Sequence, residues 1–246
     1  MKSKIFTLIV IGIVLLAGCK DKVNTTKNYY CQLKVVPLFN GQEMELNVPY
    51  TGADGNAFKF ERIAFFTTNL SVNNYGLMKE ASLFNMGKNE YLFNTKSLVN
   101  EVKTLDFHTG VTSQFNHTDP TIFGNNHALN IANVDGLHWG WDPGYIFIAI
   151  EGKADTIADG QDNFDHSFVY HVGKDGNGRL HQFENVETVA LNDTTHCAYL
   201  YLDMHTFFFG ATDTIHVNSE NSIHEGGQFE ALAQKTVENF NSALTK

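Results

Sequence analysis

The sequence lacks a second long apolar run and lacks any excess of basic residues. Beyond one apolar stretch near its start, nothing approaches the roughly 20 apolar residues that a membrane-spanning helix needs. Lysine and arginine total 17 against 27 aspartate and glutamate residues, a formal charge of −10. This balance argues against nucleic acid or anionic lipid headgroups as partners and is compatible with cations. There is also no linker rich in proline, glycine or serine and no internal repeat, which favours one domain.

The start of the chain resembles a bacterial lipoprotein signal. Two lysines precede an apolar run from Ile5 to Ala17, and the run closes on Leu-Ala-Gly directly before Cys19. The apolar run is too short to span a membrane. We therefore expect residues 1–18 to be a signal peptide, Cys19 to be lipidated, residues 19–29 to be a tether and residues 30–246 to be the folded domain. Loss of Lys2 and Lys4 leaves 15 basic against 27 acidic residues, a formal charge of −12.

A lipid anchor of this kind places the mature protein in the cell envelope, at the outer membrane, on its periplasmic face or at the cell surface. Cysteine is scarce, with three in the whole sequence. If Cys19 carries lipid, Cys31 and Cys197 remain in a compartment where a disulfide persists. The sequence leaves two alternatives open, namely a bridge between Cys31 and Cys197 or two separate buried thiols.

The apolar pattern predicts mainly strands. An Asn40-Gly41 turn joins the two halves of a hairpin over residues 32–48. Further strands are expected at residues 58–72, 91–93, 104–111, 145–151, 167–172, 187–191 and 198–209. From Phe229 to Leu244 the apolar residues recur with the period of a helix. The predicted fold is all-β, an antiparallel β-sandwich of the Greek-key type with one C-terminal amphipathic helix.

Residues 112–136 interrupt the strands with asparagine, aspartate, glycine and proline. A loop of this length in a compact domain is usually functional or disordered. Its several apolar residues, among them Phe115, Phe123 and Leu129, make disorder less favourable. We expect this loop to lie packed across the sandwich.

Histidine is absent from the first 107 residues, and all 11 histidines follow. None of them shows the local spacing of a zinc site, so a metal centre would be assembled from separate strands and loops. His171 ends a predicted strand beside Gly173, His205 lies on the polar and aromatic face of the last strand, and His127 could fold back towards His138. Taken singly, each is more typical of a structural or surface histidine than of a ligand.

The two tryptophans of the chain lie one residue apart, in the segment Leu137-His138-Trp139-Gly140-Trp141-Asp142-Pro143-Gly144-Tyr145. Two large aromatic side chains beside a histidine, at the start of a strand, indicate a site. The alternative is that Trp139 and Trp141 close the end of the sandwich, since aromatic residues dominate core burial.

Residues 136–152 resemble the Trp-x-Trp, Gly-Tyr-x-Phe and Glu-Gly core of MbnP-like proteins. Two further segments match in the same order, His127-Ala128-Leu129 upstream and Tyr170-His171-Val172-Gly173 downstream. The resemblance covers roughly residues 30–210 and is nearest to lipoprotein members from Bacteroidetes-type bacteria. Two departures stand out: no proline follows His127, and some members carry four cysteines where this chain has Cys31 and Cys197.

The resemblance implies an envelope copper-binding protein. In related copper proteins a tryptophan is oxidised to kynurenine, whose aniline nitrogen joins histidines around copper, and a di-haem enzyme similar to cytochrome c peroxidase is the oxidising partner. Carried over, the modified residue is Trp139 or Trp141, with Trp139 preferred. The candidate metal ligands are His127, His138, His171 and His205.

Two other functions compete with copper capture or homeostasis. A β-sandwich with exposed tyrosine and tryptophan is typical of a cell-surface module that recognises glycans or proteins. An enzyme is less favoured, because the sequence has no nucleophile elbow, metalloprotease helix or phosphate loop. We therefore expect a copper-binding protein that is not an enzyme.

Overall fold

The computed structural model describes residues 29–74, 76–97, 101–140, 143–157, 159, 161, 163–210, 213–223 and 229–246. The predicted signal segment, Cys19 and Trp141 lie outside these residues. In the described part of the chain the strands form two mixed sheets, and three α-helices are added to them. No helix among the described residues is long and apolar enough to cross a membrane.

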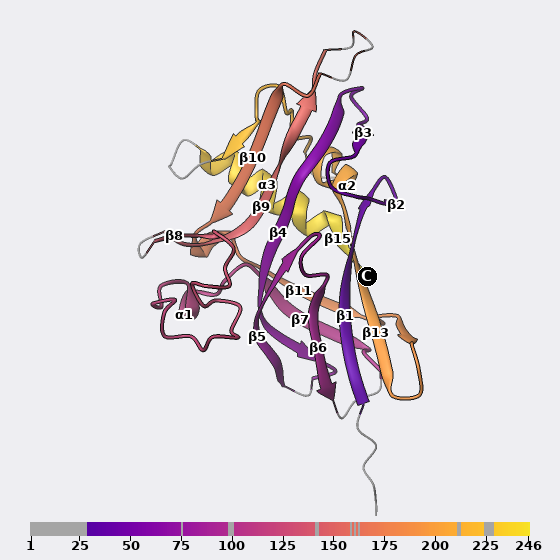
Figure 1. Ribbon diagram of the computed structural model, residues 1–246, viewed down its shortest axis with the longest axis vertical. Coiled ribbons are helices and arrows are strands. Elements are labelled where there is room, and N and C mark those ends of the chain that lie inside the picture. The colour runs from indigo at the N-terminus through magenta and orange to yellow at the C-terminus, as the bar shows by residue number, and fades with distance from the viewer. Residues whose placement is uncertain are drawn as a thin grey trace, which may run out of the picture.

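The smaller sheet is built around the first strand (Figure 1). Its spatial order is β12 (Thr188–Ala190), β13 (Thr195–Asp203), β1 (Tyr29–Phe39) and β2 (Gln42–Glu43), with β6 (Tyr91–Ser97) also on β1 and β15 (Leu244–Thr245) on β13. β1 and β13 run parallel, with Leu33 opposite Ala198 and Val35 opposite Leu200. The all-β prediction is confirmed, and this parallel pair makes the smaller sheet mixed rather than wholly antiparallel.

The larger sheet carries most of the strands. Its order is β11 (Arg179–Glu184), β7 (Thr104–Thr109), β4 (Ala57–Val72), β9 (Gly144–Asp155), β10 (His166–Gly173) and β14 (Ser222–Ile223), with β3 (Pro49–Thr51) and β5 (Leu77–Asn85) on β4 and β8 (His138–Gly140) on β9. The long β4 holds the sheet together, because it pairs with both β7 and β9 along its length.

Phenylalanine fills much of the space between the sheets. On β4 the alternate residues Phe58 and Phe60 are fully buried, as alternation along a strand requires. Their rings meet Phe168 of β10 and Phe208 of α2 (Met204–Phe209) at centroid distances of 4.6–6.2 Å. Phe65, beyond a register shift between Phe60 and Arg62, is also fully buried. Burying one such side chain contributes on the order of 1.5–3 kcal/mol.

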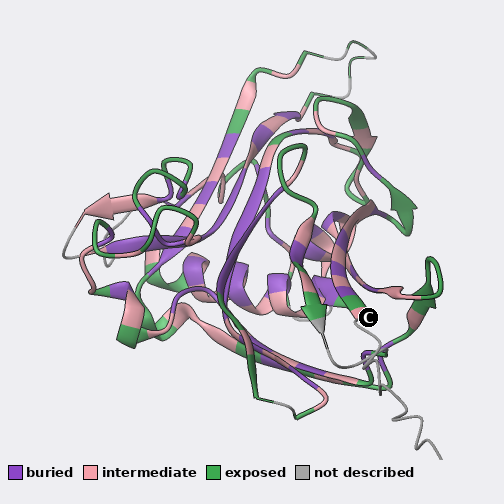
Figure 2. Cartoon of the chain, turned by 60° about the horizontal axis from the view of Figure 1, so that its bottom comes forward, coloured by how far each residue is buried: buried purple, intermediate pink, exposed green. Residues whose placement is uncertain are grey.

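The helix predicted near the C-terminus is present as α3 (Glu230–Ala243). Its buried residues include Ala233, Val237 and Phe240, which share one helical face. The Phe240 ring lies 5.1 Å from that of Phe65, edge to face. Figure 2 shows the buried side of α3 turned towards the sheets, while exposed residues collect on the peripheral loops.

The Asn40-Gly41 turn forms as predicted. Both residues have positive φ, 51° and 75°, which is the conformation of a tight hairpin turn. The Asp203 carboxylate accepts hydrogen bonds from the Asn40 and Gly41 amides at 3.0 and 2.8 Å. It also accepts from the amide of His205 at 2.9 Å, which caps the start of α2.

The strand predicted to continue to residue 209 therefore ends at Asp203. An aspartate whose carboxylate can accept from the backbone amides of the next residues is a strong N-cap. The helical turn after Asp203 therefore pairs amides that an extended chain would leave without a partner. His205 consequently lies on α2 and not on a strand face. The alternation of residues in the sequence did not distinguish a strand that continues to residue 209 from a strand followed by a helix. β5 and β11, which were not predicted, complete the larger sheet.

The loop over residues 112–136 packs against the outer face of the larger sheet, as predicted. It contains the short α1 (Ser113–Asn116) and buries Leu129 and Val134. The Tyr145 hydroxyl of β9 donates to the Leu129 carbonyl at 2.6 Å, and Tyr145 is fully buried beneath the loop.

Candidate functional site

The tryptophan segment forms a short hairpin at the end of the larger sheet. β8 pairs with the start of β9, with His138 opposite Tyr145 and Gly140 opposite Gly144. Gly144 has a positive φ of 72°, and a Cβ there would collide with the Asn116 side chain. Oδ1 of the same Asn116 side chain accepts a hydrogen bond from the Tyr145 amide at 2.9 Å. The hairpin is thus fixed by α1 and by the absence of a side chain at residue 144.

Trp139 lies against the last residue of β10. A Cβ built on Gly173 would lie 2.7 Å from Cζ3 of the Trp139 ring, so only glycine permits this approach. Trp139 is half-buried and packs against the core. His171 precedes Gly173 by two residues on β10, and the pairing of β10 with β9 shifts register between Val172 and Gly173. Trp139 therefore contacts the end of the strand that carries His171.

His171 is held by a carboxylate on the neighbouring strand. Its Nε2 lies 2.9 Å from Oε1 of Glu151, and the same oxygen is 3.2 Å from Arg62 Nη1. The His171 and Glu151 side chains are both mostly shielded from solvent. The hydrogen bond with His171 and the charges of Arg62 and His171 lower the pKa of Glu151, while burial opposes the shift. A carboxylate behind an imidazole is the usual arrangement that orients a histidine ligand.

Asp135 joins this group to the loop. Arg62 Nη2 donates to the Asp135 backbone carbonyl at 2.6 Å, and the Asp135 carboxylate accepts from Lys88 at 2.9 Å. The Lys88 hydrogen bond holds the pKa of Asp135 below its usual range, aided by the charges of Lys88 and Arg62 and by Asn85, against the effect of burial. A continuous chain of charged groups thus runs from His171 through Glu151 and Arg62 to the loop.

His138 lies near this group but points to Tyr145. The two rings meet edge to face with centroids 4.7 Å apart. Burial lowers the pKa of His138, which favours the neutral imidazole that binds metals. His138 is partly buried on β8, one residue before Trp139.

His127 occupies the loop beyond Tyr145. Its ring stacks on Phe123 at 4.6 Å, and its Nδ1 accepts from the Leu129 amide at 3.2 Å. Its Nε2 is buried and lies 3.4 Å from Glu80 of β5 without hydrogen-bond geometry. His127 accepts from the Leu129 amide, and the His138 ring contacts Tyr145. Because the Tyr145 hydroxyl donates to the Leu129 carbonyl, the two histidines are linked through Leu129 and Tyr145.

The remaining predicted residues lie elsewhere. His205 packs on α2 against Phe39 and Phe209, at ring distances of 5.6 and 4.9 Å. Figure 1 shows α2 and β8 on opposite sides of the molecule, so His205 is not brought to Trp139.

Cys31 and Cys197 are both buried free thiols. In the β1–β13 register Cys31 pairs with His196 and Gln32 with Cys197, so the two thiols point to opposite faces of the sheet. A bridge between them would require movement of the backbone. Burial raises the pKa of the Cys31 thiol to about 11, with a smaller contribution from Cys197.

Arg62, Glu151 and Asp135 were not predicted as site residues. Glu151 belongs to the Glu-Gly pair that closes the matched motif, and it could have been found from its place on the strand beside that of His171. Among the described residues, no three histidine, cysteine, aspartate or glutamate side chains gather closely enough to hold a metal ion.

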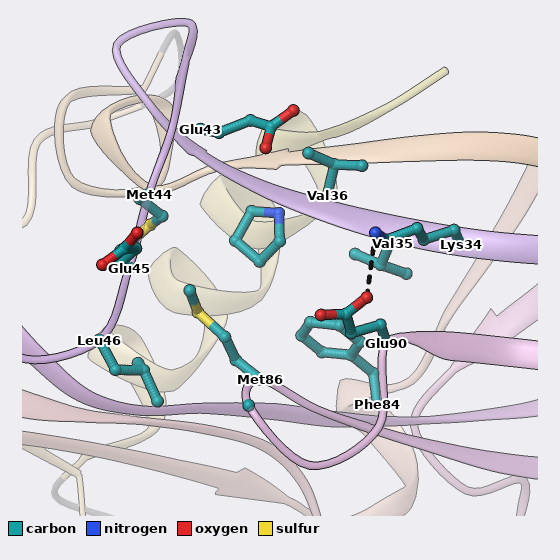
Figure 3. Close-up of a pocket in the computed structure, with 12 residues that line it drawn as sticks. Lys34, Val35, Val36, Glu43, Met44, Glu45, Leu46, Phe84, Met86 and Glu90 are labelled. Atoms are coloured by element: carbon teal, nitrogen blue, oxygen red, sulfur yellow. Dashed lines mark ion pairs between the residues drawn. The ribbon is translucent and has the colours of Figure 1, made fainter.

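A separate cavity of about 310 Å³ lies beside β1 (Figure 3). Met44 and Met86 point into it, and Lys34 and Glu90 form an ion pair of 3.0 Å at its edge. None of the predicted site residues lines this cavity.

The structure defines a two-sheet β-sandwich whose larger sheet carries His138 and Trp139 on β8 and His171 on β10. The sequence matches the MbnP family over residues 28–225, most of the chain, and the protein belongs to this family. The resemblance drawn from the three sequence segments is confirmed. The family is one of binding proteins and is related to copper handling in the cell envelope.

A solved structure, that of MbnP from Methylosinus trichosporium, is similar to this chain with a TM-score of 0.50. The sequences are 14% identical, and the match covers 76% of this chain and 80% of that one. At this identity the likeness supports the fold alone. No curated protein sequence matches the chain significantly.

Proposed function

We propose that this protein is a copper-binding lipoprotein of the bacterial cell envelope, used for copper capture or homeostasis and not for catalysis. The observation that carries the proposal is the contact of Trp139 with Gly173, beside His171, in a member of the MbnP family. Cys19 would carry the lipid anchor at the outer membrane. The acidic surface, with a formal charge of −10 in the full sequence, suits the attraction of cations.

The chemistry needs Trp139 or Trp141 in an oxidised form. Indole donates one hydrogen bond and offers no nitrogen lone pair to a metal. Conversion to kynurenine adds one oxygen, removes one carbon and exposes an aromatic amine. A di-haem peroxidase-like enzyme would supply the oxidising equivalents. Trp139 is preferred because it lies against Gly173, two residues after His171 on β10.

In this arrangement His171 would supply one imidazole, and Glu151 would keep its ring in place. His138 and His127 are the further candidate ligands, in that order, because His138 adjoins Trp139 in the chain. Imidazole and amine nitrogens suit both oxidation states of copper. The aromatic surround of Tyr145 and Phe66, whose rings meet at 5.6 Å, would keep water from the ligands.

The test is a mass measurement together with a copper titration. Mature protein would be produced with and without its di-haem partner, and the tryptophan peptide analysed for gain of one oxygen and loss of one carbon. Copper(I) affinity would then be measured against a competing chelator for wild type and Trp139→Phe. We expect modification and tight binding only in the co-produced wild type. Absence of copper binding above chelator competition in that sample would overturn the proposal.

A further inference from the structure

A groove of about 950 Å³ lies where the edges of the two sheets come together. Within the described chain β5 pairs only with β4 and β6 only with β1, so each of these strands has one edge without a partner. β5 and β6 are joined by a tight turn with a bridge between Asn85 and Asn89. The loop over residues 125–135 forms the opposite wall. We call this surface the edge groove.

Some backbone carbonyls along the edge groove already accept hydrogen bonds from side chains of the protein. The Ser82 hydroxyl donates to the carbonyl of Leu92, and the Asn89 amide donates to the carbonyl of Leu83 at 2.7 Å. Carbonyls along a free edge are the groups that an added strand would use. Since side chains cap two of them, an extended peptide could not pair with β5 or β6 without displacing those side chains.

Side-chain amides remain available in the edge groove. Asn94 of β6 and the loop residues Asn125 and Asn126 line it and are exposed. Their side-chain amides form no hydrogen bond with other residues that the structure describes. Each amide presents a donor and an acceptor side by side, the pairing that neighbouring hydroxyl groups of a sugar require.

The charge of the edge groove is nearly balanced, although the chain as a whole carries −10. Lys88 is paired with Asp135 at 2.9 Å, which leaves Lys79 as the one lining charge outside an ion pair. Tyr91 and Met78 add apolar surface to the same groove. Polar groups that fix orientation, set among apolar surface, are the usual composition of a small-molecule site.

We propose that the edge groove binds a neutral oligosaccharide. The amides of Asn94, Asn125 and Asn126 hydrogen-bond the hydroxyl groups, and the Tyr91 ring contacts the apolar face of one sugar ring. A peptide is disfavoured because the edge carbonyls are capped, and an anionic ligand is disfavoured because the groove has little net charge. None of the tryptophan and histidine site residues lines the edge groove, and Asp135, which bonds to Arg62, is the lining residue that connects it to the His171 network.

Calorimetric titration with linear hexasaccharides of β-1,4-glucan, α-1,4-glucan and β-1,4-mannan tests the proposal on the full mature protein. We expect at least one of them to bind with a dissociation constant below about 1 mM. The double variant Asn94→Ala/Asn126→Ala should weaken that binding about five- to tenfold, since each lost hydrogen bond has a modest effect. Asn218→Ala, an exposed asparagine outside the groove, is the matched control and should leave binding unchanged.

Tyr91→Ala serves as a second variant and should lower affinity about tenfold, with its melting curve recorded to show that it folds. Binding should be insensitive to salt, because the ligand is neutral. Failure of all three sugars to bind at about 10 mM would overturn the proposal, as would equal affinity of the double variant and wild type. Trp139→Phe should bind the sugar normally, which separates this result from the outcome of the copper titration.

Discussion

His171 and His181 are both partly or fully shielded histidines on the larger sheet, yet their surroundings differ. His171 faces a carboxylate, Glu151, which is itself tied to Arg62. His181, only 5% exposed, stacks on Phe107 at 5.0 Å and on Phe183 at 5.7 Å. Its Nε2 lies 2.8 Å from the Thr109 hydroxyl. One histidine lies in a charged network beside a tryptophan, whereas the other fills an aromatic core.

The difference shows that the neighbours of a histidine, and not its residue type, decide its role. Burial, and then the nearby His108, lower the pKa of His181 to about 4, so it stays neutral at ordinary pH. A neutral, stacked and hydrogen-bonded imidazole acts as a core side chain. His171 instead has a partner that fixes its ring, which is what a ligand position requires.

The largest expected effect is on copper affinity, when the imidazoles of His171 and His181 are removed one at a time. His171→Ala should weaken copper binding more than 100-fold in the tryptophan-modified protein, because the proposed copper site would lose one of its imidazoles. His181→Ala should lower stability and leave copper affinity within about twofold. Chelator competition and thermal unfolding of both variants measure the two effects. If His181→Ala abolishes copper binding in folded protein, the distinction between the two histidines is wrong.

The second prediction concerns pH. The folded-state pKa of His181 is below that of an exposed histidine, so the unfolded chain binds a proton first as pH falls. The contribution of neutral His181 to the free energy of unfolding is therefore complete above about pH 6.5 and is lost as the pH falls towards 4. It amounts to about 3 kcal/mol. Urea unfolding at several pH values measures it. His181→Phe should flatten the profile over this range, and an unchanged profile would mean that other groups control acid unfolding.

The third prediction concerns the contact between Gly173 and Trp139. Gly173→Ala places a Cβ 2.7 Å from the Trp139 ring and from the Tyr145 carbonyl oxygen, so the hairpin must shift. We expect a loss of about 1–3 kcal/mol in stability and a red shift of tryptophan fluorescence. Gly176→Ala is the control, because a Cβ there meets nothing within 4 Å. Equal spectra for the two variants would place Trp139 away from Gly173.

The smallest expected effect is that of Glu151→Gln. The variant keeps the size of the side chain but removes the charge that His171 and Arg62 contact, and should weaken copper binding about tenfold. Glu151→Asp should recover part of the affinity if the carboxylate positions His171. Glu61→Gln, at an exposed glutamate on the neighbouring β4, provides a control with the same loss of one negative charge. An affinity unchanged by Glu151→Gln would indicate that Glu151 serves the fold alone.

Much of the fold could be predicted from local signals. The Asn40-Gly41 turn, the β4 strand and α3 each follow from a pattern within a few residues of the chain. The end of β13 at Asp203 could not be predicted, because the groups that Asp203 caps come partly from a turn far away in sequence. The parallel pairing of β1 with β13 is likewise a long-range property.

For the site, sequence indicated Trp139 and His171 because they lie in motifs. The sequence did not reveal that the Trp139 ring contacts Gly173, two residues after His171, because the ring comes from a different strand. Nor did it separate His205 from the others, because a histidine on α2 and one on a strand look alike in sequence. Arg62 and Asp135 were missed because their hydrogen bond joins residues 73 positions apart, which no local pattern reveals.

The parallel pairing of β1 with β13 also sets an order of events when the protein is made. The hydrogen bond between Asn40 and Asp203 links residues 163 positions apart, so the first strand has no parallel neighbour until most of the chain has been made. Long-range pairing of this kind is slow and leaves apolar strand edges exposed meanwhile. The nascent chain should therefore depend on chaperones, and truncation before residue 195 should yield aggregated rather than partly folded protein.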